Sequence, residues 1–125
     1  MQRIRKKLYC YGVIKMSDLT DKKCVPCEGG VPPLEAAEVE RLLTEVNNWE
    51  FVDKEPPRIK KEFKFKNFQG SMDFVNGVAE VAESEGHHPN ISVNYNKVTL
   101  TLYTHAIDGL HENDFILAAK IDELV

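Results

Sequence analysis

Three of the four histidines in this 125-residue chain stand close to positions where the sequence predicts the end of a helix or a strand. His87 and His88 follow Glu83 and precede Pro89, and His105 follows the last predicted strand. Imidazole can donate and accept protons near neutral pH, so histidine is suited to acid and base catalysis. Because Pro89 favours an extended backbone at His88, the adjacent imidazoles should point apart. They are better placed to flank a substrate than to chelate one ion side by side.

Two other interpretations of these histidines stay open from the residues alone. Three histidines could bind zinc, although zinc ligands usually stand at helical or alternate-strand spacing, which these lack. They could also be ordinary surface or core residues. Cys24-Val25-Pro26-Cys27 has the spacing of a zinc knuckle or a redox pair, but no second Cys-x-x-Cys is present. We expect reduced cysteines rather than a disulfide framework, because their number is odd and no secretory signal precedes them.

Hydrophobic periodicity predicts the elements that would position the histidines. Helical spacing of apolar residues predicts three helices, over residues 34–47, 68–85 and 112–124. Alternation and short apolar runs predict four strands, over residues 49–52, 58–66, 91–95 and 98–103. Neighbouring strands are joined by short links, which favours antiparallel pairing. We expect an α+β two-layer sandwich of order α-β-β-α-β-β-α, with helices on one face of a four-stranded antiparallel sheet.

Composition and charge limit the possible functions. Hydrophobic residues make up 42% and charged residues 29%, which indicates a folded domain, and no apolar run is long enough to span a bilayer. Residues 1–15 are basic, so the rest of the chain is strongly acidic within a net charge of −4, which argues against nucleic-acid binding. That basic start could be an upstream extension, a transit peptide or a nucleic-acid arm. With no export signal, we expect a cytoplasmic protein.

The domain boundary and the position of His105 are two further expectations. Residues 28–33 are rich in glycine and proline, so we expect a flexible tail over 1–32 and one domain over 33–125. If the last strand continued to His105, that residue would share a face with Thr99 and Thr101. A pocket shared with the other histidines then requires a bend near Thr104 or a site at the end of the sheet.

The pattern around the histidines resembles the signature of the pterin-4a-carbinolamine dehydratases. Its seven positions are Glu83, His87, His88, Pro89, Tyr95, His105 and Asp114. Neighbouring matches are Trp49, Phe63-x-Phe65-x-Asn67-Phe68, Tyr95-Asn96-Lys97-Val98, Thr104-His105 and Gly109-Leu110-x4-Phe115. The resemblance covers about residues 33–124 and is greatest to bacterial members. His111 stands where animal members have Ser or Thr, which would cap the last helix better.

The resemblance implies a specific reaction and roles for the histidines. Such enzymes dehydrate 4a-hydroxytetrahydropterin to quinonoid dihydropterin and water, and they need no metal or organic cofactor. Their substrate is released by aromatic amino acid hydroxylases, which implies functional coupling to phenylalanine hydroxylase. By resemblance, His87, His88 and His105 are catalytic. We expect His88 and His105 to transfer the two protons, and His87 to bind and polarise the ring.

The resemblance also implies supporting residues. Glu83 precedes His87 by four residues and is close enough to orient an imidazole. Asp114 is expected to hold His105 or to cap the last helix. Trp49 and Pro89 are expected to bind substrate or to support the site.

Assembly and two alternative functions follow from the same resemblance. Relatives form dimers by joining sheet edges and tetramers by packing helices, so we expect a homodimer or a homotetramer. Animal relatives also stabilise dimers of a homeodomain transcription factor, so a protein-binding module is one alternative. An enzyme acting on another pterin is the other.

Overall fold

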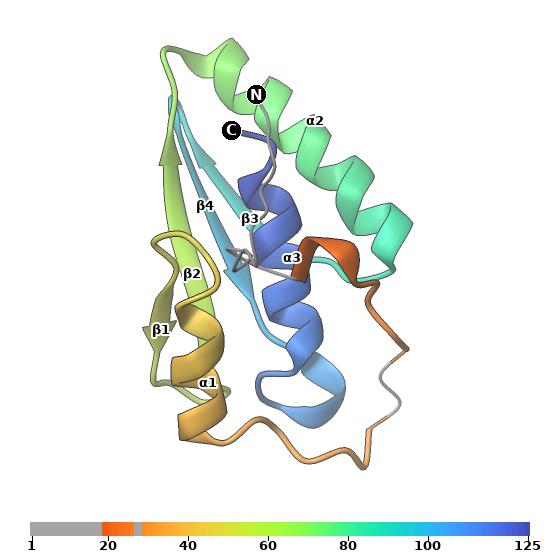
Figure 1. The fold of residues 1–125 in the computed structure, drawn as a ribbon. Coiled ribbons are helices and arrows are strands. Elements are labelled where there is room, and N and C mark those ends of the chain that lie inside the picture. The colour runs from red at the N-terminus through yellow and green to blue at the C-terminus, as the bar shows by residue number, and fades with distance from the viewer. Residues whose placement is uncertain (1–18, 27–28) are drawn as a thin grey trace, which may run out of the picture.

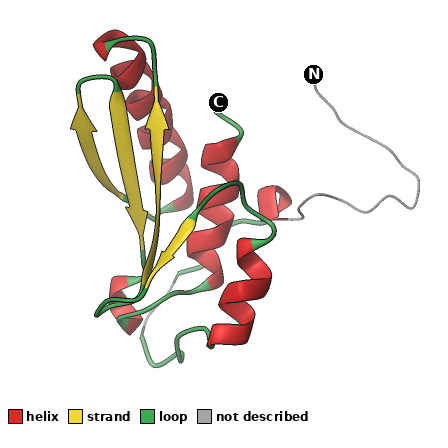
Figure 2. Cartoon of the chain, turned by 90° about the vertical axis from the view of Figure 1, so that its left-hand side faces the viewer, coloured by secondary structure: helices red, strands yellow, loops and turns green. Residues whose placement is uncertain are grey.

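A four-stranded antiparallel sheet and three α-helices make up the computed structural model, which describes residues 19–26 and 29–125. The helices are α1 (Ala36–Leu43), α2 (Phe68–Glu85) and α3 (Glu112–Asp122). The strands are β1 (Glu50–Val52), β2 (Arg58–Lys64), β3 (Asn90–Asn94) and β4 (Lys97–Leu102). The sheet order is β1-β2-β4-β3, with antiparallel pairing throughout. Figures 1 and 2 show the helices on one side of the sheet, which confirms the expected fold class and element order.

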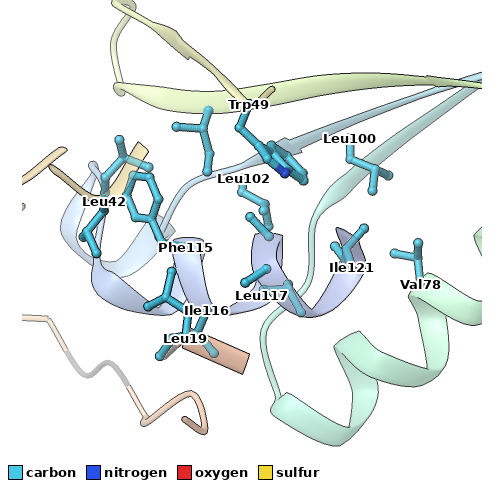
Figure 3. Packing of buried hydrophobic residues seen from close by; sticks show 14 of the residues in the cluster. Leu19, Leu42, Trp49, Val78, Leu100, Leu102, Phe115, Ile116, Leu117 and Ile121 are labelled. Carbon is cyan, nitrogen blue, oxygen red and sulfur yellow. The ribbon is translucent and has the colours of Figure 1, made fainter. Parts of the chain in front are cut away.

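The alternating sequence of β4 explains how the two layers pack. Its residues are buried and half-buried in turn: Val98, Leu100 and Leu102 are buried, and Thr99 and Thr101 are half-buried. The helix α3 packs against the buried face, and eight of its eleven residues are themselves buried. Figure 3 shows side chains of α3, among them Phe115 and Ile121, facing the buried residues of the sheet. The central helix of the molecule therefore carries little exposed surface.

Local sequence determines where the elements that carry the histidines end. The helix α2 stops at Gly86, which has φ 67°, a left-handed conformation that glycine adopts without strain. The strand β4 stops at Leu102, and Thr104 then forms an isolated bridge with Gly109. A short 3₁₀ helix, His105–Ile107, lies between the two bridge partners. The chain thus bends at Thr104, so His105 does not continue the strand.

The packed part of the chain begins earlier than the sequence suggested. Leu19 lies in a short 3₁₀ helix, Leu19–Asp21, is only 1% exposed and belongs to the hydrophobic core. Residues 19–26, which the sequence assigned to the tail, pack on the domain through this leucine and through hydrogen bonds of Cys24 and Val25. The basic residues 1–15 and Cys27 lie outside the described residues, and so do the expectations about them.

Candidate active site

The centre of the candidate site is Asp114, a fully buried carboxylate in the first turn of α3. Its Oδ1 lies 2.6 Å from His87 Nε2. Its Oδ2 accepts the hydroxyl of Thr104 at 2.9 Å and the backbone N–H of His111 at 3.0 Å. A carboxylate can only accept hydrogen bonds, so three donors satisfy a group whose burial would otherwise be costly. Asp114 thereby links the chain after α2, which carries His87, to the turn that leads into His105.

These contacts show which partners Asp114 and Glu83 have among the alternatives that the sequence left open. Asp114 caps α3, as one alternative proposed, but the imidazole that it holds is that of His87 and not of His105. Glu83, which was expected to orient an imidazole, contacts that of His88: its Oε2 lies 2.6 Å from His88 Nε2. The reason is the left-handed turn at Gly86, after which helical i, i+4 spacing no longer decides which side chains meet.

The N-cap of α3 is a further correction. His111 was expected to cap this helix poorly, but its Nδ1 accepts the backbone N–H of Asn113 at 2.9 Å. Together with the bond from the His111 backbone N–H to Asp114, this makes a capping box. An imidazole nitrogen with its lone pair toward the helix therefore does what a serine or threonine oxygen usually does at this position.

The three expected catalytic histidines differ in their exposure. The side chain of His87 is 14% exposed, whereas those of His88 and its partner Glu83 are 59% and 77% exposed. His105 is also exposed, and its ring centroid lies 6.2 Å from that of Tyr103. No described residue forms a hydrogen bond with the ring of His105. The site thus combines one histidine anchored on a buried carboxylate with two that are accessible to a ligand.

Trp49 and Pro89, the other two expected site residues, occupy different surroundings. Trp49 is 6% exposed and packs edge-on against Phe63 in the core, with ring centroids 6.1 Å apart. Its indole N–H donates to both carboxylate oxygens of Asp122, at 3.1 and 3.2 Å. Lys61 also donates to Asp122, at 2.8 Å. Trp49 therefore takes part in the packing of β2 against α3, whereas Pro89 is half-buried next to His88 at the start of β3.

Sequence reasoning missed the contact of Thr104 with Asp114 and the role of the His111 backbone in this site. Thr104 is 4% exposed, and its hydroxyl is one of the three donors to Asp114. The available signal was the spacing of His111 and Asp114, three residues apart at a predicted helix start, which is that of a capping box. No local signal points to Thr104, because its partner lies ten residues away across a turn.

Two features are absent from the residues that the structure describes. Within 19–26 and 29–125, no group of three or more His, Cys, Asp or Glu side chains is arranged to hold a metal ion, so the three-histidine zinc site is not found there. In the same part of the chain, no helix has the length and apolar character needed to cross a membrane.

Comparison with known proteins identifies the family. Residues 32–124 match the family model described as pterin 4 alpha carbinolamine dehydratase, which covers most of the chain and all the residues of the candidate site. The chain belongs to the pterin-4-alpha-carbinolamine dehydratase family. The resemblance inferred from the histidine pattern is thereby confirmed.

Individual relatives of this pterin dehydratase family member agree with that assignment. A protein of Rubrobacter xylanophilus, named "Putative pterin-4-alpha-carbinolamine dehydratase", is 49% identical over 87% of this chain and 100% of its own length. One of the same name from Methylococcus capsulatus is 50% identical over 85% of this chain and 92% of its own length. These relatives are bacterial, as the resemblance suggested.

Two solved structures are similar to this chain. The transcriptional coactivator/pterin dehydratase of Brucella melitensis is 34% identical, with a TM-score of 0.69, over 74% of this chain and 97% of that one. A pterin dehydratase-like protein described as a RuBisCO assembly factor in the α-carboxysome is 30% identical, with a TM-score of 0.55, over 62% of this chain and 89% of that one. The fold is thus shared with proteins that are described as an enzyme, a coactivator and an assembly factor.

Proposed function

We propose that this chain removes water from 4a-hydroxytetrahydropterin, giving quinonoid dihydropterin, with histidines as acid and base. One observation carries the proposal. The buried carboxylate of Asp114 contacts both His87 and Thr104, so one group fixes both segments that bear the exposed histidines. Membership in a family named for this dehydration supports the choice of substrate class.

The proposed reaction needs one proton donor and one proton acceptor. The hydroxyl on C4a leaves as water when it receives a proton, and the C4a–N5 double bond forms when the proton on N5 is removed. One histidine gives a proton and another takes one, so the total protonation of the site is unchanged after each turnover. A positioned acid or base typically contributes a factor of about 10²–10⁴ to the rate.

The contacts of the three histidines support a division of roles. His88 and His105 are exposed, and we assign the two proton transfers to them. His87 is held at Nε2 by Asp114, which leaves Nδ1 to bind and polarise the pterin ring. Glu83 contacts His88, and we assign to it a looser orienting role than that of the buried Asp114 toward His87.

A stopped-flow assay tests the proposed function. Freshly generated 4a-hydroxytetrahydropterin is mixed with the purified protein, and quinonoid dihydropterin is followed above the spontaneous rate, with and without a chelator. His88→Ala and His105→Ala should each lower turnover by roughly 10²–10⁴ without unfolding the protein. His111→Ser is the matched control, because it replaces the fourth histidine and retains a capping side chain and the backbone N–H. A loss of less than threefold in folded His88→Ala or His105→Ala would remove that histidine from the mechanism.

Assembly of two or four copies is part of the proposal. The strand β3 is an edge of the sheet, and all five of its residues are exposed. Ile91 and Val93 pair with the buried Leu100 and Val98 of β4, yet they are 40% and 37% exposed. An apolar, unpaired edge of this kind favours pairing with another strand. Light scattering after size exclusion should give the mass of a dimer or a tetramer, and a monomer at micromolar concentration would contradict this part.

Protein binding is the second candidate function. The structural relatives are described as a transcriptional coactivator and as an assembly factor, so this fold also serves proteins with macromolecular partners. Capture of a specific partner by a chain that does not accelerate pterin dehydration would favour this alternative. If the dehydration is confirmed, an aromatic amino acid hydroxylase such as phenylalanine hydroxylase is the class of enzyme that would supply the substrate.

A further inference from the structure

We propose that two consecutive backbone amides of the N-terminal segment fasten the end of α2 to the start of α3 and so hold His87 and Asp114 at hydrogen-bond distance. The amides are those of Cys24 and Val25, and their acceptors are the side chains of Glu85 and Asn113. We call these four residues the clip. The inference rests on the proposed function, because it assigns Asn113 and Glu85 as positioning residues for the same site.

The first half of the clip is on α2. The backbone N–H of Cys24 donates to Glu85 Oε1 at 2.8 Å, and Lys120 of α3 donates to Oε2 at 2.8 Å. The Glu85 side chain is only 5% exposed. The hydrogen bond from Lys120 holds the pKa of Glu85 below its ordinary value, and the Cys24 amide acts in the same direction. Glu85 ends α2 and precedes His87 by two residues, so whatever fixes this carboxylate also fixes the chain that enters the site.

The second half of the clip is on α3. The side chain of Asn113 accepts the backbone N–H of Val25 at 3.0 Å and donates to the Val25 carbonyl at 2.7 Å. The side-chain carbonyl and NH₂ group of Asn113 thus bond both backbone groups of Val25, as a residue of a neighbouring strand would. Asn113 is 2% exposed and immediately precedes Asp114. A buried amide with both groups satisfied has one orientation, so it transmits the position of the N-terminal segment to the adjacent carboxylate.

The chain that follows the clip also runs close to the segment that carries His105. A Cβ added to Gly29 would lie 3.4 Å from the carbonyl oxygen of Ala106, which directly follows His105. Farther along, the backbone N–H of Leu34 donates to the Leu110 carbonyl at 2.9 Å. Figure 1 shows this part of the chain, in orange, passing beside the blue turn between β4 and α3 before it enters α1. The chain before α1 therefore bonds to the end of α2, to the start of α3 and to the turn that follows His105.

The clip matters because the bond between His87 and Asp114 joins the same two elements. Cys24 and Val25 are adjacent in sequence, so the distance between Glu85 and Asn113 is limited by a single peptide unit. Without that restraint, the ends of α2 and α3 can move relative to one another. A misplacement of about 1 Å in a catalytic arrangement can lower the rate by roughly 10²-fold. The clip thus acts on the rate through the orientation of His87, without contact to substrate.

The test uses the full-length chain with Asn113→Ala. The expected result is a fall in kcat of roughly 10- to 100-fold with a smaller change in KM, because the loss lies in orientation. Asn96→Ala is the matched control: its side-chain amide also bonds a backbone carbonyl, that of Phe65 at 3.1 Å, in the β3–β4 turn. That turn is at the opposite end of these strands from His88 and His105. Asn96→Ala should lower the free energy of unfolding by an amount comparable to Asn113→Ala and leave kcat unchanged.

Two further measurements separate positioning from general stability. In a His87→Gln background, Asn113→Ala should have little additional effect on kcat, because the residue through which the clip acts is already lost. The ¹⁵N shift of His87 Nε2 should change in Asn113→Ala and stay constant in Asn96→Ala. Equal losses of kcat in the two backgrounds, or an unchanged His87 shift in folded protein, would overturn the inference.

Two results of these experiments call for a different readout. If Asn113→Ala does not fold, Glu85→Ala breaks the other half of the clip and is judged by the same measurements. If the wild-type chain does not accelerate dehydration, the proposed function fails, and the His87 shift alone then decides whether the clip positions His87.

Discussion

Replacing Asp114 by asparagine changes one atom type at the centre of the site. Thr104 and the backbone N–H of His111 both donate to Oδ2, whereas His87 meets Oδ1. An asparagine with its oxygen at the Oδ2 position keeps the first two bonds and places its NH₂ group against His87. Nε2 of His87 must then accept, so the ring proton moves to Nδ1. The substitution therefore reverses the His87 tautomer with little change in packing.

The size of the effect follows from the bond between His87 and residue 114, which loses its charge and reverses its direction. One charge-assisted hydrogen bond contributes about 1.5–3 kcal/mol, which corresponds to roughly 10- to 100-fold in kcat/KM. The stopped-flow dehydration assay measures the rate, and ¹⁵N spectra of the imidazole report which ring nitrogen carries the proton. Asp122→Asn is the matched control, because it makes the same change on the same helix at a carboxylate that holds Trp49 and Lys61. It should lower stability and leave the rate unchanged. A folded Asp114→Asn protein with wild-type kcat/KM, or with the proton still on Nε2, would refute the reasoning.

Three further predictions concern groups around the site. Because Lys120 holds the pKa of Glu85 below 4.5, this carboxylate stabilises the fold above pH 4.5 and ceases to do so as the pH falls through the lowered pKa. The urea midpoints of wild type and Glu85→Gln should therefore differ near neutral pH and converge in acid. A difference in midpoint that stays the same at every pH would contradict this. Burial raises the pKa of the Cys24 thiol to about 12. In a protein whose other two cysteines are replaced by serine, iodoacetamide at pH 8 should therefore label the folded state at least about 10²-fold more slowly than the unfolded chain. Equal labelling rates would show an accessible thiolate. Trp49→Phe should lower the free energy of unfolding by about 1–3 kcal/mol, because Asp122 loses a partly buried donor, with turnover unchanged; a specific rise in KM would instead make Trp49 a substrate contact.

Much of the fold follows from local patterns in the sequence. Alternation in β4 predicts which residues face the helices, because successive side chains of a strand point to opposite faces. The stop at Gly86 is equally local, since a left-handed residue is needed to end the helix. Helix α1 is shorter than the predicted range of 34–47, and its chain leaves the helical conformation before Asn48, which has φ 62°. Such ends depend on how the next segment packs, so periodicity locates them poorly.

The partners of the site residues could not be predicted in the same way. The sequence singled out Glu83, His87 and Asp114 but left their partners open, because their contacts depend on the path of the chain after Gly86 and after Leu102. Leu19 presents the same difficulty. It is a single leucine in a polar segment, and its burial is decided by residues of α3 that follow it by about a hundred positions.

The contrast in burial across the site has a consequence for its motions. Asp114 lies in α3, most of whose residues are buried, so exposing this carboxylate requires opening a large part of the structure. Amide hydrogens of the buried part of α3 should therefore be among the slowest to exchange with deuterium. Glu83 and His88, by contrast, have water around most of their side chains and can change rotamer within nanoseconds. Asp114, which sets the orientation of His87, is thus closed to solvent for as long as the protein stays folded. His88, which we assign to proton transfer, can exchange its proton with water between turnovers.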